Sequence, residues 1–269
     1  MRSCTGSPGT IGTAFDYRLR YFLVVTPPES FVAVHGASRL AGGRSPDEAV
    51  EALDRLAAGT DLFSSILTHL KRVVGHVRPV GRRLTLAEEE ELCRYCYLLA
   101  LYDECCRMSG GGESPLQRLV PDASVDDASA LVPEAAVADL CALVDGLHRS
   151  ELASRSGRVI ANPSFSGGTL VGGADGDLII GDCLIDAKAT IRGLKRDWLY
   201  QVIGYLLLDF GDAHGIRTTG FYHARVPALL AWGLRAMLDE AAEGSVDIAA
   251  LRRDFRKVRP EDGGRRWSA

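Results

Sequence analysis

The sequence predicts an α/β protein with a helical N-terminal region. Helical periodicity dominates up to about residue 108, where apolar residues recur every three or four positions. From about residue 158, short apolar runs separated by Gly, Asn and Asp take over, which is typical of strands and turns. A hydrophobic content of 46% in 269 residues is sufficient for one large soluble domain or two small ones.

Three segments of the N-terminal region carry the signals of helices. Residues 45–57 open with "SPDE", a capping box with proline at the first helical position. Residues 61–77 place their apolar side chains on one stripe at helical spacing. Residues 85–108 repeat the capping box with Thr85 and Glu88 and continue as a helix for about 20 residues.

The chain is expected to have four parts. A glycine-rich break followed by an acidic, loop-like stretch separates the helical N-terminal region from a second region with mixed elements. The predicted parts are the helical N-terminal region 1–108, a linker 109–130, a core with C-terminal helices 131–258, and a loose tail 259–269.

The core is predicted to run in the order helix, three strands, helix, strand, with one more helix after it. The first helix is amphipathic, and the strands are short apolar runs bounded by turn residues. The expected ranges are a helix at 132–152, strands at 158–165, 174–180 and 183–190, a helix at 195–210, a strand at 217–225 and a helix at 226–242.

A Gly-Asp dipeptide at 181–182 separates two apolar runs and predicts a tight hairpin, although it is a weaker type I′ signal than Asn-Gly. Counting outward from this turn pairs Asp177 with Asp186 and Asp175 with Lys188. Because side chains alternate along a strand, these four charged residues share one face of the sheet. The opposite face carries apolar residues and suits a core.

Two carboxylates that face each other across a hairpin repel and destabilise it, and a divalent cation between them removes that cost. Oxygen-only ligands favour a hard ion, Mg²⁺ or Mn²⁺. Lys188 is then placed to hold a water or a phosphate oxygen beside the metal, which is a layout for hydrolysis of a phosphodiester. The alternative is that the aspartates are solvated on an exposed face and that Lys188 pairs with Asp175.

In order and spacing these residues resemble the PD-(D/E)xK nuclease superfamily. Asp177 and the triplet Asp186-Ala187-Lys188 fit its signature of an aspartate on the second strand and (Asp/Glu)-x-Lys on the third. The RecB-like branch adds Gln-x-x-x-Tyr on the next helix. Gln201 and Tyr205 match this motif, and their i, i+4 spacing puts both on one helical face.

The resemblance covers about residues 131–225 and implies a restriction-endonuclease-like core that cleaves DNA with Mg²⁺ or Mn²⁺. It implies that Asp177 and Asp186 hold the metal and that Lys188 orients the water. Gln201 and Tyr205 would support the site or touch the substrate backbone.

Two assignments within the resemblance keep alternatives. The superfamily often supplies a glutamate from the first core helix, for which Glu151 is the best candidate and Glu134 the alternative. Asp175 competes with Asp177 as the metal ligand, although the hairpin register favours Asp177. Some RecB-like relatives carry an iron–sulfur cluster that uses three cysteines after the core. This chain has no cysteine after Cys183, so we expect neither an iron–sulfur cluster nor zinc.

Basic residues mark candidate contacts with nucleic acid. Arg192, Lys195 and Arg196 lie between the predicted third strand and the Gln201 helix, so we expect them to contact phosphates near the cleft mouth. Two further basic segments, 12–22 and 252–260, either extend this surface or form the solvated faces of amphipathic helices. The formal net charge of −4 excludes a uniformly basic binder but not a local basic patch.

The remaining expectations concern compartment and partners. The seven cysteines are odd in number and mostly lie in apolar helical patterns, which favours reduced thiols in the cytoplasm. The sequence has no run of about 18 apolar residues and no signal-peptide pattern, so no membrane association is expected. The expected partners are DNA and a protein partner in a defence or repair complex. A non-catalytic nucleic-acid-binding or scaffold subunit, and an RNA-directed nuclease, stay open as alternatives.

Overall fold

The computed structural model describes most of the chain and divides it into two compact units, Met1–Arg149 and Ser150–Ala269. This division falls later in the chain than the predicted linker at 109–130. The predicted helix at 45–57 and the tail at 259–269 lie outside the described residues. The described residues are 7–24, 32–41, 61–75, 82–107, 114–120, 122–171 and 173–257.

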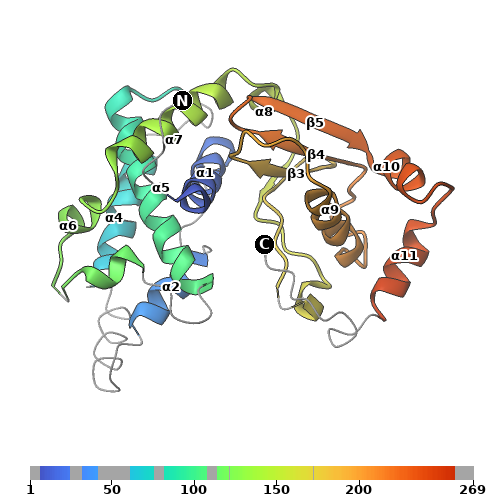
Figure 1. Cartoon of the computed structure of the whole chain (residues 1–269), viewed down its shortest axis with the longest axis horizontal. Coiled ribbons are helices and arrows are strands. Elements are labelled where there is room, and N and C mark those ends of the chain that lie inside the picture. Colours follow the sequence, from blue (N-terminus) through green and yellow to red (C-terminus); the bar gives the residue numbers. More distant parts are fainter. Residues whose placement is uncertain are drawn as a thin grey trace. The chain divides into compact units, whose positions relative to one another are not determined.

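The first unit is helical in its described part, and helix α5 (Leu86–Arg107) is its centre (Figure 1). Helix α5 packs against helices α1, α2, α4, α6 and α7, and most of its residues from Leu92 to Cys105 are buried. The surrounding elements are α1 (Pro8–Leu23), α2 (Val32–Ala41), α4 (Leu62–Gly75), the short 3₁₀ helix η2 (Pro115–Arg118), α6 (Val125–Ser129) and α7 (Glu134–His148).

Two helix predictions for this unit are confirmed. The stripe on 61–77 becomes α4, which buries Ile66, Leu70 and Val73. The capping box before α5 forms as expected, because the backbone N–H of Thr85 donates to Glu88 Oε2 at 2.8 Å and the N–H of Glu88 donates to Thr85 Oγ1 at 3.3 Å.

The expectation of an exposed basic face on residues 12–22 is wrong. Arg18 is fully buried in α1, where its Nε and Nη2 donate to the carboxylate of Glu89 at 2.6 and 2.8 Å. Arg20 is only 9% exposed. A buried arginine is tolerated where a carboxylate accepts from its planar guanidinium in this bidentate way, so Arg18 ties α1 to α5 instead of facing solvent.

The second unit is built on a five-stranded mixed sheet in the order β1-β2-β3-β4-β5. Strands β3 and β4 are parallel, and all other neighbours are antiparallel. Figure 1 shows β3, β4 and β5 as neighbouring arrows with helix α9 beside them. The elements are α8 (Glu151–Ser154), β1 (Val159–Ala161), η3 (Gly168–Val171), β2 (Leu178–Ile180), β3 (Cys183–Lys188), α9 (Arg196–Leu208), β4 (Thr218–His223), β5 (Ala228–Gly233), α10 (Leu234–Ala241) and α11 (Ile248–Phe255).

The predicted hairpin register is confirmed for the three residue pairs next to the turn, whereas the predicted pairs Asp177 with Asp186 and Asp175 with Lys188 lie beyond the ladder of β2 with β3. Ile180 pairs with Cys183 across the turn, and the pairing continues outward to Leu178 with Ile185. Gly181 has a φ of 64°, whereas Asp182 does not adopt a positive φ, which excludes a type I′ turn because that type needs positive φ at both central residues.

Helix α9 makes the crossover between the parallel strands β3 and β4. It buries Val202, Leu206 and Leu208 in a core with Ile179, Leu184 and Phe221 of the sheet. A parallel pair needs a crossover of this kind, and the buried stripe fixes the rotation of the helix about its axis. That rotation decides which α9 residues lie beside β3.

Two element predictions in this half of the chain need correction. Residues 226–242 form strand β5 and then α10 instead of one helix, because the run from Ala228 to Gly233 pairs antiparallel with β4. A short apolar run fits either a strand or a buried helix, and here the neighbouring strand decides. The predicted helix at 132–152 is interrupted at Arg149, between α7 and α8.

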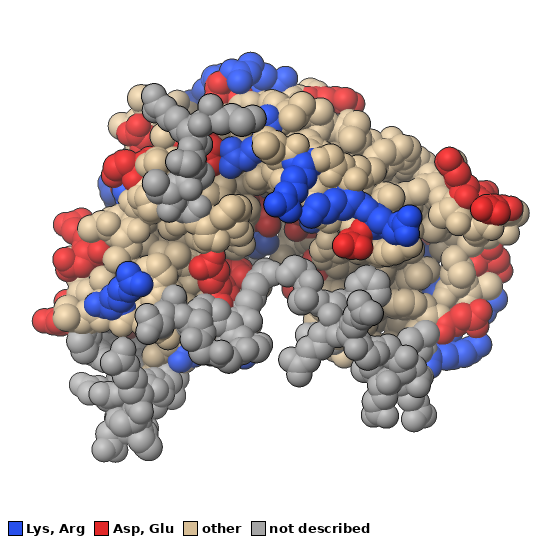
Figure 2. All heavy atoms as spheres, in the orientation of Figure 1, with Lys and Arg blue, Asp and Glu red and all other residues tan. Residues whose placement is uncertain are grey.

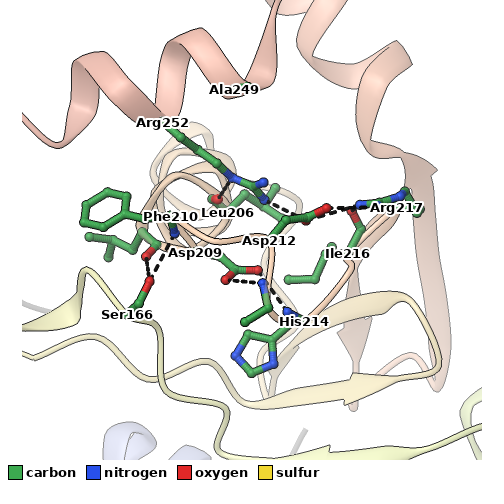
Figure 3. A network of polar contacts seen from close by, with 12 residues as sticks. Ser166, Leu206, Asp209, Phe210, Asp212, His214, Ile216, Arg217, Ala249 and Arg252 are labelled. Carbon is green, nitrogen blue, oxygen red and sulfur yellow. Dashed lines mark hydrogen bonds and ion pairs between the residues drawn. The ribbon is translucent and has the colours of Figure 1, made fainter.

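The turn after α9 is held by buried polar contacts (Figure 3). Asp209 is 1% exposed, and its carboxylate accepts from the backbone N–H of Ala213 at 2.9 Å and of His214 at 3.2 Å. These bonds satisfy donors that would otherwise be unpaired at the end of the helix, so they fix the path from α9 to β4.

Arg252 of α11 joins the same network. One interpretation of residues 252–260 placed this arginine on a basic surface, and that expectation is wrong for Arg252. Its guanidinium is nearly buried, with Nε donating to the Leu206 carbonyl at 3.0 Å and Nη2 pairing with Asp212 at 3.2 Å (Figure 3). Asp212 also pairs with Arg217 at 2.9 Å. Helix α11 is therefore anchored to α9 through its arginine.

None of the helices in the described ranges is long and apolar enough to span a membrane.

Candidate functional site

The two candidate ligand aspartates come from neighbouring strands of the hairpin. Asp186 lies in β3, and Asp177 directly precedes β2. The Asp177 Oδ2 atom accepts a hydrogen bond of 2.7 Å from the backbone N–H of Ala187, which lies beyond the residues that pair with β2. This bond holds the Asp177 carboxylate against β3 next to Asp186. Asp175 is exposed and forms an isolated bridge with Ser164.

Asp186 is a buried carboxyl, with 2% of its surface exposed. Burial and then the charge of Asp177 raise its pKa, the ammonium of Lys188 opposes both effects, and the net result is a pKa of about 7. The Asp186 Oδ2 atom lies 2.7 Å from Lys188 Nζ as an ion pair, but outside the angles of a good hydrogen bond. The buried Oδ2 atom therefore has a charged neighbour but no hydrogen bond of good geometry from a described residue.

Lys188 connects the carboxylates of the hairpin to helix α9. Its ammonium pairs with Asp186 and donates to Gln201 Oε1 at 3.3 Å, and Gln201 Nε2 donates to the Tyr205 hydroxyl at 2.8 Å. The network thus runs from the third strand across to two successive turns of one helical face. Four residues that the sequence singled out separately are brought together by these contacts.

Tyr205 closes the network on the helix side. Burial raises the pKa of its hydroxyl, and the charges of Asp177, Asp186 and Asp175 raise it further, so the hydroxyl stays neutral at physiological pH. The ring stacks on Phe165 with centroids 5.3 Å apart, which fixes its position. A neutral tyrosine hydroxyl is able to donate a hydrogen bond to an anionic ligand.

Trp198 adds an aromatic neighbour to the site, which the sequence analysis did not include among the site residues. Lys188 Nζ lies 5.6 Å from its ring centroid, and Lys195 Nζ lies 5.8 Å from the same centroid. The ring also packs against His223, which lies beside Lys188 in the register of β3 and β4. The sequence signal was the position of Trp198 three residues before Gln201, which places both on neighbouring parts of the helix surface.

The remaining predicted site residues do not join this network. Glu151 is exposed in the first turn of α8, and no hydrogen bond or ion pair links its carboxylate to a described residue. Arg192, Lys195 and Arg196 are exposed in the segment from β3 into α9. Their roles stay predictions.

The pair Asp177 and Asp186 suits a small hard cation. No group of three or more His, Cys, Asp and Glu residues arranged to hold a metal is present among the residues that the structure describes. Mg²⁺ commonly binds through one or two carboxylates, completing its shell with waters and substrate phosphates. A buried carboxyl of raised pKa beside a second carboxylate is where such an ion would relieve repulsion.

Comparisons with known proteins provide no information about the role of this site. No family model matches the chain, and neither a curated protein nor a solved structure shows significant similarity to it.

Proposed function

We propose that this protein is a metal-dependent nuclease that hydrolyses phosphodiester bonds in DNA. The observation that carries the proposal is the continuous network from Asp186 through Lys188 and Gln201 to Tyr205, with Asp177 held beside it. Each of these residues has a separate role in the chemistry that the resemblance to the PD-(D/E)xK superfamily implies. They meet at one place on the hairpin and α9.

The order of elements supports a restriction-endonuclease-like core. The antiparallel meander β1-β2-β3 is followed by the crossover helix α9 and the parallel strand β4. The expected helix before the meander corresponds to the short α8 in the same compact unit, or to α7 in the other. The strand and helix that carry the site therefore follow the expected pattern.

In this proposal Asp177 and Asp186 hold the metal, Mg²⁺ or Mn²⁺. When bound there, the metal would lower the pKa of a water molecule and neutralise charge on the scissile phosphate. The protein supplies two carboxylates whose positions are set by strand pairing and by the bond from Ala187 N–H. Burial disfavours the ionised form of the Asp186 carboxyl, and a divalent cation held beside it would favour that form.

Lys188 supplies the positive charge beside the attacking water. Its ammonium is restrained by Asp186, Gln201 and the Trp198 ring, so it is oriented before substrate arrives. A preorganised cation stabilises the negative charge that develops on the phosphoryl oxygens, at little cost in reorganisation. Gln201 and Tyr205 position this lysine and offer their polar groups to the substrate backbone.

A nuclease assay tests the proposal. Linear, circular, single-stranded and double-stranded DNA, and an RNA of the same sequence, are incubated with Mg²⁺, Mn²⁺ or EDTA. Lys188→Ala is compared with Lys257→Ala, which removes an exposed lysine at the end of α11. We expect metal-dependent DNA cleavage that Lys188→Ala abolishes and Lys257→Ala preserves.

Three results would contradict the proposal in whole or in part. Cleavage that survives Lys188→Ala would come from another site or from a contaminant. No cleavage by the folded protein under any condition would favour the scaffold alternative, a subunit of a defence or repair complex that retains the fold. Cleavage of RNA but not DNA would change the substrate and keep the site.

A further inference from the structure

The segment from the end of β3 into α9 forms an exposed basic surface. Its cations Arg192, Lys195 and Arg196 are exposed, and none of them forms an ion pair with a residue in the described ranges. Residues 189–200 contain these three cations and one carboxylate, Asp197, a net charge of +2 in a chain of net charge −4. Figure 2 shows basic side chains gathered over the region of α9.

The same segment exposes large apolar side chains between its cations. Ile191 is 67% exposed, Leu194 is 41% exposed and Tyr200 is 50% exposed. These are three of the eleven large hydrophobic residues that are exposed in the described part of the chain. Cations alternating with exposed apolar and aromatic groups suit a ligand that has both phosphates and free base faces.

Helical geometry relates this surface to the site. At 100° per residue, Tyr200, Gly204 and Gln201 lie at about 40°, 80° and 140° around the helix from Arg196. In angle around the axis, Gly204 therefore lies between the exposed Tyr200 and the site residue Gln201, about one turn further along the helix. Asp197 faces the same side of α9 as Gly204, but it lies in the first turn of the helix, about two turns before Gly204.

Gly204 leaves the helix backbone uncovered at this point. A Cβ built on it would meet no atom within 4 Å, so packing within the chain does not require a glycine here. Glycine inside a helix is unfavourable relative to alanine, and it allows a ligand to approach the backbone closely. This open stretch of backbone lies about one turn further along α9 than Tyr200 and Gln201.

Lys195 connects the surface to the site on the strand side. Because Lys195 Nζ and Lys188 Nζ both lie within about 6 Å of the Trp198 ring centroid, the two ammonium groups are within roughly 12 Å of each other. A single strand that contacts Lys195 with one phosphate is thus within a few nucleotides of Lys188.

We propose that this surface binds single-stranded nucleic acid and delivers it to the site. The cations of 192–196 hold phosphates, Tyr200 stacks on an unpaired base, and the strand passes over Gly204 towards Lys188. The substrate class is therefore a single strand or a single-stranded end, and the delivery step rests on the proposed nuclease function. A duplex would bury its base faces in its own stack and gain nothing from Tyr200. The local net positive charge favours a polyanion over a protein partner.

Binding is measured without cleavage, by fluorescence anisotropy in EDTA at low salt. The probes are a fluorescein-labelled single-stranded oligonucleotide and the same sequence as a blunt duplex. The variants are Tyr200→Ala, Tyr200→Phe and Gly204→Leu, with Leu251→Ala as the control for loss of an exposed apolar side chain elsewhere. Circular dichroism and urea unfolding establish that each variant is folded.

We expect tighter binding to the single strand than to the duplex. Tyr200→Ala should weaken single-strand binding by roughly 5- to 150-fold, the range for loss of one base–aromatic stack, and Tyr200→Phe should restore it. Gly204→Leu should weaken it while the helix is retained, and Leu251→Ala should have no effect. Equal affinity for both probes, or single-strand binding that is unaffected by Tyr200→Ala, would overturn the inference.

The two proposals fail separately. If Lys188→Ala abolishes cleavage but Tyr200→Ala leaves single-strand binding intact, the nuclease proposal stands and the inference about its substrate fails. If Tyr200-dependent binding is present without cleavage under any metal condition, the binding surface stands and the nuclease proposal fails.

Discussion

Replacement of Asp186 by Asn is expected to stabilise the metal-free protein at neutral and alkaline pH. In the folded protein the pKa of this carboxyl is raised from its ordinary value of 3.8 to about 7, chiefly by burial and then by Asp177. A raised pKa means that the folded state binds the proton more tightly than the unfolded state. The stabilisation that the protonated Asp186 carboxyl gives to the folded state is fully present below pH 3.8 and is lost as pH rises to about 7.

The magnitude follows from the same shift. At 1.36 kcal/mol per pKa unit, ionisation of Asp186 costs the folded state up to about 4 kcal/mol, an order-of-magnitude upper limit. Asn has the size and neutral polarity of the protonated acid, so Asp186→Asn removes most of this cost above pH 7. The exposed Asp182→Asn in the same hairpin is the control, because its carboxylate is already solvated.

The assay is urea unfolding in EDTA at several pH values between 4 and 8, followed by circular dichroism. The free energy of unfolding of Asp186→Asn minus that of the wild type should be small at pH 4 and should grow towards pH 8. Mg²⁺ should reduce this difference by stabilising only the wild type. A difference that does not change with pH, or a variant less stable than the wild type at pH 8, would refute the reasoning.

Three further changes have distinct expected results. Tyr205→Phe removes the acceptor of the Gln201 Nε2 hydrogen bond. We therefore expect the rate of DNA cleavage to fall roughly 10-fold, with little change in DNA affinity measured in EDTA. An unchanged cleavage rate would exclude a positioning role for Tyr205. Gly204→Ala should raise the free energy of unfolding by about 1 kcal/mol, measured in urea, and lower stability would mean that the glycine is needed for packing. Arg252→Ala should lower the free energy of unfolding by about 2 kcal/mol, because the variant loses the contacts with Leu206 and Asp212. The control Arg235→Ala removes an exposed arginine and should change the free energy of unfolding by less than about 0.5 kcal/mol. Equal effects of the two substitutions would contradict the anchoring role of Arg252.

The candidate site was predicted from residues that are close in sequence, and the resemblance supplied the roles of these residues. A two-residue turn fixes the register of a hairpin, so counting from 181–182 placed Asp177, Asp186 and Lys188 on one face. Helical spacing then placed Gln201 and Tyr205 on one side of α9. These are rules about neighbouring residues, and they need no knowledge of the remaining fold.

The burial of charged residues was not predictable in the same way. Arg18 pairs with Glu89, 71 positions away, and Arg252 bonds to Leu206, 46 positions away. A sequence shows that an arginine lies on the polar side of a pattern, but not that a distant carboxylate or carbonyl will meet it. Both arginines were read as surface charges for this reason.

The sequence by itself determined the hairpin register, the two site residues on one helical face, and the α/β character of the chain. Only the tertiary structure decided that residues 228–233 form strand β5, because β4 offers that run a partner along its whole length. Tertiary packing also turned α9 so that Gln201 meets Lys188 and so that Trp198 lies beside the same ammonium. Periodicity shows which residues share a face, whereas long-range pairing and packing decide what that face meets.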